Sequence, residues 1–125
     1  MSRVLYEGKV GAKFIESINV FWPSNGTAAP AAANIVTTQE CTITYAATGK
    51  FTVTFTRPYT KVYGAYADYM LATANGNYAQ VDSINVNSSG VCVVVVGIYS
   101  NAGVASAPAA AGANNNVMLA LELGF

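Results

Sequence analysis

The 125-residue sequence contains no histidine. Histidine is the side chain that most often serves as a catalytic base or metal ligand near neutral pH. Its absence excludes nucleophile–histidine arrangements, and two cysteines without histidine cannot complete an ordinary zinc site. No phosphate-binding loop occurs. The acids are scattered, unlike those of a calcium loop or a glycosidase pair: Glu7, Glu16, Glu40, Asp68, Asp82 and Glu122. We therefore expect no catalytic activity, metal or cofactor.

Charge is also scarce. Only 10% of the residues are charged, against about 25% in an average soluble domain, while 53% are apolar. Six basic residues balance six acidic ones, so the chain has no electrostatic footprint for nucleic acid or for an anionic membrane. An uncharged monomer is one interpretation. We favour the other, a subunit whose surface is largely covered by neighbours.

Long apolar runs are missing too. No stretch of about 18 apolar residues exists, and residues 1–9 lack the apolar core of a secretory signal, so we expect a protein made in a cytosol and no membrane contact. The two cysteines, Cys41 and Cys92, each lie in an apolar run. We expect buried free thiols; a bridge formed in an oxidising medium is the alternative.

What the sequence does contain is period-two alternation, the pattern of half-buried strands. In residues 40–46 and 51–56, apolar residues share one face and threonines the other, and Gly49 supplies the positive φ that a hairpin turn needs. A second hairpin is predicted over 81–86 and 91–99. Its second strand is apolar on both faces, which predicts burial on both sides, against the core and against a loop or another subunit.

Further strands are predicted at 4–6, 13–22, 61–71 and 117–123. Short strands with frequent turns indicate one all-β domain over 1–125, a β-sandwich or jelly roll, with residues 1–11 as an N-terminal arm. Two uncharged loops rich in Ala, Asn, Gly and Pro, 23–34 and 101–116, interrupt the strands. We expect these loops and the arm to lie against a partner.

Aromatic residues suggest where contacts lie, since tyrosine and tryptophan often anchor interfaces and also stack on sugar rings. In the strand 61–71, alternation places Tyr63 and Tyr69 on one face and Tyr66 on the other. We weigh strand and subunit-interface roles above a carbohydrate platform. The candidate contact residues are Trp22, Tyr63, Tyr66, Tyr69, Val104 and Pro108.

The segment TGKFTVTFTRPY at residues 48–59 resembles a hairpin found in many virion proteins of tailed bacteriophages. In those proteins a Tyr/Ala-rich strand follows, here 62–67, and a late Val-rich strand, a polar loop and a C-terminal strand complete the similarity, which covers residues 40–125. The resemblance implies a β-sandwich virion protein, made in the host cytoplasm and similar to head decoration (cement) proteins. No catalytic or ligand-binding residue is implied.

The leading hypothesis is therefore a capsid decoration subunit that staples major capsid proteins and forms a homo-oligomer, for which a trimer is one arrangement. The alternative is a tail or head-fibre component whose Trp22 and tyrosines bind host glycans. The decoration hypothesis is favoured because the domain is short and self-contained and carries no repetitive shaft.

Overall fold

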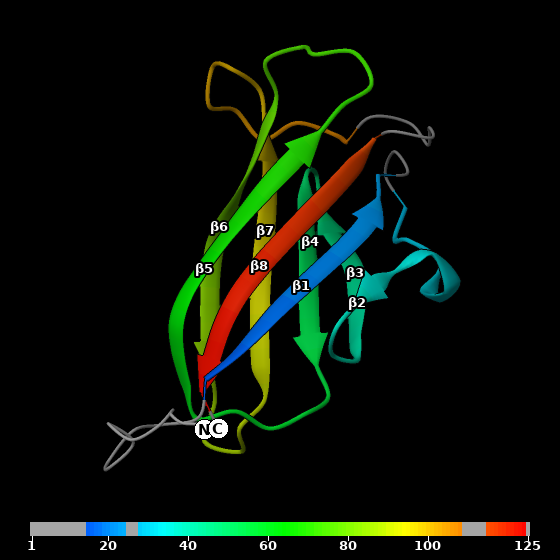
Figure 1. Ribbon diagram of the computed structural model, residues 1–125. Coiled ribbons are helices and arrows are strands. Elements are labelled where there is room, and N and C mark those ends of the chain that lie inside the picture. The colour runs from blue at the N-terminus through cyan, green and yellow to red at the C-terminus, as the bar shows by residue number, and fades with distance from the viewer. Residues whose placement is uncertain (1–14, 25–27, 109–114, 125) are drawn as a thin grey trace, which may run out of the picture.

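Two antiparallel sheets of four strands each pack face to face as a β-sandwich (Figure 1). The structure is a computed structural model that describes residues 15–24, 28–108 and 115–124. The first sheet has the order β2-β1-β8-β5 and the second the order β3-β4-β7-β6. The predicted β-sandwich is confirmed. The predicted strand at 4–6, the whole N-terminal arm and parts of both long loops lie outside the described residues.

The element bounds follow the predicted strands closely. They are β1 Ile15–Pro23, a 3-10 turn η1 Ala32–Asn34, β2 Val36–Thr37, β3 Cys41–Ala47, β4 Lys50–Phe55, β5 Lys61–Met70, β6 Tyr78–Val86, β7 Cys92–Tyr99 and β8 Asn116–Gly124. Both predicted hairpins form, as β3–β4 and β6–β7. The short strand β2 and the turn η1 were not predicted, because two or three residues show no periodicity.

The turn between β3 and β4 depends on Gly49. Its φ is +69°, and a Cβ built there would stand 2.5 Å from the backbone oxygen of Ser106. The Gly49 N–H donates a 2.8 Å hydrogen bond to the hydroxyl of Tyr45, and the Ile98 N–H donates to the Gly49 oxygen. Gly49 thus joins the hairpin tip to the end of β7 and to the segment that follows it.

The core lies between the sheets and is filled from both. The Trp22 ring of β1 meets the Phe51 ring of β4 edge-on, with centroids 5.6 Å apart, so this pair spans the two layers. The largest side chains with almost no exposure are Trp22, Tyr59, Phe51, Phe55, Ile18, Ile98, Leu119, Leu121 and Leu123. Such burial is the main favourable term in the stability of the fold.

The doubly apolar strand β7 has its core face buried as predicted, and the predicted cover of its other face by another subunit stays a prediction. Cys92, Val94, Val96 and Ile98 face the core and are fully buried. On the other face Val93 and Val95 are half-buried, and the residues paired with them come from β4 and β6. The partial burial of these two valines follows from β7 being a central strand with neighbours on both sides. In the described residues, no further layer lies over this face.

Both cysteines are free, and Cys92 is buried while Cys41 is half-buried. Burial raises the pKa of the Cys92 thiol to about 11. It also raises the pKa of the Cys41 thiol, so neither cysteine has the character of a reactive thiolate.

Candidate binding surface

The most exposed apolar side chains of the strands gather on the outer face of the first sheet. The register places Val36 of β2, Phe21 of β1 and Met118 of β8 in one row across the sheet. The next row contains Asn19, Ala120 and Tyr66. We call this surface the outer apolar face and define it by Phe21, Val36, Tyr66, Met70, Met118 and Ala120.

Four of these side chains are open to solvent in the single chain, while Met118 and Ala120 are half-buried. Val36 is 64% exposed, Tyr66 60%, Met70 53% and Phe21 40%. They lie outside because their strands alternate: in β1, Ile18, Val20 and Trp22 face the core, so Ser17, Asn19 and Phe21 face outward. An apolar group on one sheet face, rimmed by polar residues, is typical of a protein contact site.

Two carboxylates, Glu122 and Asp68, lie on the outer side of this sheet. Glu122 faces outward on β8 and accepts 2.8 Å hydrogen bonds from the Ser17 hydroxyl. Asp68 pairs with Met118 and therefore lies within the face, between Tyr66 and Met70 on β5. It accepts a hydrogen bond from the Tyr69 N–H. The two rows that define the outer apolar face carry no charge other than Asp68, which limits the cost of removing water from them.

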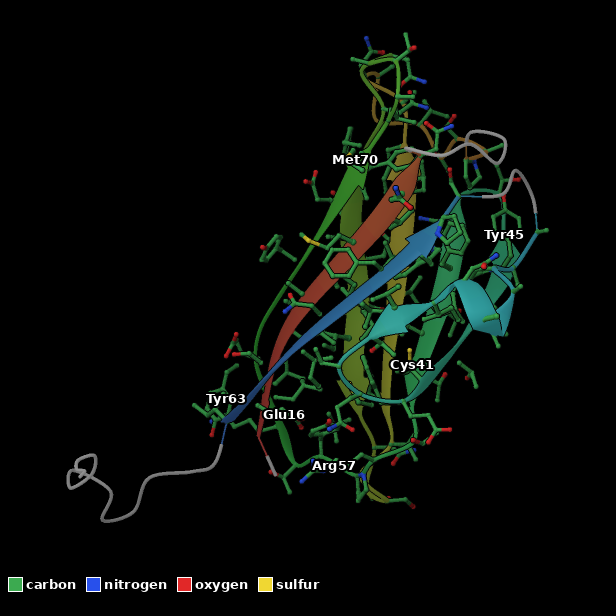
Figure 2. The ribbon with its side chains drawn as sticks, turned by 45° about the vertical axis from the view of Figure 1, so that its right-hand side comes forward. Glu16, Cys41, Tyr45, Arg57, Tyr63 and Met70 are labelled. Carbon is green, nitrogen blue, oxygen red and sulfur yellow. The ribbon has the colours of Figure 1, made fainter. Side chains whose placement is uncertain are left out.

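The structure separates the six predicted contact residues. Tyr66 belongs to the outer apolar face, and Tyr63, which is 42% exposed, lies on the same strand near the end opposite Met70 (Figure 2). Val104 is 63% exposed and lies in the segment after β7. The other three are interior, which argues against a direct contact with a partner: Trp22, Tyr69 and Pro108.

The predicted sharing of one face by Tyr63 and Tyr69 is wrong. The register of β5 against β8 shifts between Val62 and Gly64, so Tyr63 is an extra residue in a β-bulge. A bulge changes the side to which the following residues point. Tyr69 therefore faces the core while Tyr63 and Tyr66 are both exposed.

A polar cluster lies on the outside of the second sheet. Lys50 of β4 forms an ion pair with Asp82 of β6 and donates a hydrogen bond to the Tyr99 hydroxyl. That hydroxyl donates to Asp82 at 2.6 Å. In the pairing of β6 with β7, Asp82 has no partner, because the register passes from Val81 to Ser83. This bulge places the Asp82 carboxylate over Gly97. A Cβ at Gly97 would stand 2.5 Å from the carboxylate, so the cluster needs this glycine.

The charges of this cluster stabilise one another. Partial burial works to raise the pKa of Asp82, but hydrogen bonds from Lys50, Tyr99 and Gln80 outweigh it and hold the pKa below its ordinary value. The hydrogen bonds to Asp82 and Tyr99 raise the pKa of Lys50. A lysine held as a charged ammonium is not a nucleophile at neutral pH, so we assign the cluster a structural role.

A second polar group is at the end of the sandwich where β1 begins, near the labelled Glu16 and Arg57 (Figure 2). The Tyr59 hydroxyl donates to Glu16 at 2.9 Å, Gln39 donates to the other carboxylate oxygen, and Arg57 lies 3.5 Å away. Burial and the bond to Glu16 raise the pKa of Tyr59. Within the described ranges, no three His, Cys, Asp or Glu side chains are placed to hold a metal ion.

Sequence reasoning missed Phe21, Val36, Met70 and Met118. For two of them the signal was present, since the alternation that placed Trp22 and Val117 inward also turns Phe21 and Met118 outward. Val36 was missed with its short strand. The cluster of Lys50, Asp82 and Tyr99 depends on a bulge, which leaves no clear sequence pattern.

Comparison of the chain with protein-family models, with curated proteins and with solved structures finds no match. No helix among the described residues is both long and apolar enough to span a bilayer. The resemblance to phage virion proteins therefore remains a prediction.

Proposed function

We propose that this chain is a virion structural protein, a capsid decoration subunit without catalytic activity that works by binding other protein subunits. The observation that carries the proposal is the outer apolar face. It presents Val36, Phe21, Tyr66 and Met70 to solvent in a chain that has little charge to compete with protein contacts. The assignment to a virion rests on the resemblance of residues 40–125 alone.

In this proposal the outer apolar face binds the major capsid protein. Burying apolar surface yields roughly 25 cal/mol for each Å² removed from water, so a face of this kind supplies much of the binding free energy. Bound subunits would tie neighbouring capsid proteins together against internal pressure. Copies of the chain would also contact one another in the assembled particle.

The test compares two aspartate substitutions at valines of nearly equal exposure. Val36 is 64% exposed on the outer apolar face, and Val104 is 63% exposed in the segment after β7. V36D should reduce binding to capsids stripped of the protein by about tenfold or more, because it buries a charge in the contact. V104D should bind like wild type. The measurement is the number of copies retained per particle after sedimentation.

The opposite result would reject the outer apolar face as the contact. If V104D lost binding and V36D did not, the contact would instead be the predicted loop over 101–116. The decoration assignment would fail if neither the wild-type chain nor either variant bound capsids and mass spectrometry of purified virions found no copies of the chain.

The glycan-binding alternative is less well supported. Trp22, which this hypothesis named together with the tyrosines, is fully buried against Phe51. Tyr66 is exposed, but its cross-strand partner is Ala120, whose side chain offers no hydrogen bond. Sugar sites combine an aromatic surface with fixed polar partners, and the outer apolar face offers few.

A further inference from the structure

The sheet edges differ in how they are protected. An edge strand has unpaired backbone groups, and proteins usually protect it with a short strand, a bulge or a charge. In the described part of the chain, β2 has only two residues, β5 has a bulge after Val62, and β6 has a bulge at Asp82. The fourth edge, β3, lacks these features along Cys41–Tyr45. Its seven residues carry no charge and no proline, and its register shift comes only after Tyr45.

The ladder fixes which backbone groups of β3 are free. The Thr56 N–H donates to the Glu40 oxygen, which makes these two residues a hydrogen-bonded pair. Bonded and non-bonded pairs alternate in an antiparallel ladder, so Thr42 and Thr44 direct their backbone groups toward β4. The backbone groups of residues 41, 43 and 45 then point away from the sheet. Outside the ladders, no backbone hydrogen bond between described residues uses these three.

This edge is complementary to itself. When two copies of β3 run antiparallel about a two-fold axis at Ile43, residue 41 lies opposite 45 and residue 42 opposite 44. All the paired residues are uncharged. Thr42 and Thr44 point to the outer face of the sheet and are exposed, so the two threonines would meet as a cross-strand pair, which is a favourable combination.

We propose that β3 pairs with β3 of a second copy, joining two β3-β4-β7-β6 sheets into one continuous sheet of eight strands. The contact is isologous, since the same surface is used by both copies and the two-fold axis closes the pair. It gives a dimer, in contrast to the trimer considered from the sequence. Because the paired run is short, the interface is small, and we expect a weak dimer that dissociates on dilution.

This inference goes beyond the proposed function and does not require it, because self-association is a property of the purified chain. It also uses a different surface, since β3 and the outer apolar face belong to different sheets. If the chain does not dimerise, the decoration role is still tested separately, by the capsid binding of V36D and V104D.

The experiment is sedimentation velocity on the full chain over a wide concentration range. The wild-type mass should rise from 13.0 kDa toward twice that value. The variant T42K/T44K should remain monomeric, because two lysines would face two lysines across the axis. The variant T42E/T44K should dimerise again, because each introduced glutamate faces an introduced lysine of the other copy. Both positions are exposed in the single chain, so neither variant should disturb folding.

Two controls make the result decisive. S83K/N85K places the same charges on exposed positions of β6, the other edge of this sheet, and should dimerise like wild type. Circular dichroism checks that every variant is folded. Wild type that stays monomeric at its solubility limit would overturn the proposal, as would T42K/T44K that dimerises normally or T42E/T44K that stays monomeric.

Discussion

Asp82 shows how a single residue can make the stability of this sandwich depend on pH. Its carboxylate is bonded to Lys50, Tyr99 and Gln80, and its pKa is lowered from the ordinary value of 3.8. A lowered pKa in the folded state means that the unfolded chain binds the proton more readily. The stabilisation is therefore present above pH 3.8 and is lost as the pH falls through the pKa of the folded protein.

We expect wild type to be more stable than D82N at neutral pH, with a difference that shrinks on acidification. Urea unfolding at about pH 7 and about pH 2 measures both free energies. Other carboxylates titrate in both proteins, so their effects cancel in the difference. A stability gap between wild type and D82N that stayed constant or widened toward low pH would contradict the assigned role of Asp82.

Individual orientations were the hardest feature to predict at the residue scale. In the structure Trp22 follows Ile18 and Val20 on the core face of β1, whereas its aromatic chemistry had made it a candidate contact. Tyr69 was placed on the wrong face because a bulge at Tyr63 shifts the count by one. Bulges depend on the pairing of two strands, and such pairing is not visible in one strand alone.

Among the elements, the β3–β4 hairpin depends most on one turn. In G49A the new methyl group would overlap the backbone of Ser106 and Ile98 at a φ of +69°. We expect a loss of at least about 2 kcal/mol in the free energy of unfolding, combining backbone strain with steric overlap. G103A is the matched control, with a φ of +78° and its nearest contact at 3.9 Å. It should lose only about 1 kcal/mol from the backbone term.

Urea unfolding of the two variants at one temperature gives the comparison. Equal losses in G49A and G103A would mean that the hairpin tip can move away from Ser106, and that the tight contact at Gly49 is not needed.

At the scale of elements the sequence was informative, since each strand from β3 to β8 was predicted to within three residues at either end. Those strands are long enough for alternation to be visible, whereas β2 is not.

For the whole molecule, Trp22 provides a test of how the two sheets come apart. It is the single tryptophan, it is fully buried, and it joins β1 of one sheet to Phe51 of the other. We expect a blue-shifted emission in the native state and a red shift that coincides with the loss of far-ultraviolet circular dichroism in urea. Coincidence is the mark of two-state unfolding of one domain.

Native emission already typical of exposed tryptophan would contradict the burial of Trp22. A fluorescence change that preceded the loss of circular dichroism would mean that the sheets separate before their strands unpair.

The strand pattern was enough to predict the fold class, two packed sheets, but it did not predict the order of the strands within each sheet. That order depends on pairings between distant residues such as Ile15 with Gly124.

The pairing of Ile15 with Gly124 has a practical consequence for protein engineering. The first and last described residues are partners in one ladder and lie at the same end of the sandwich (Figure 1). A short linker between them, with a new opening in the segment between β5 and β6, gives a circular permutant that keeps every described strand pairing. A peptide fused to one of the new termini would lie at the end of the sandwich opposite to Ile15 and Gly124 (Figure 1).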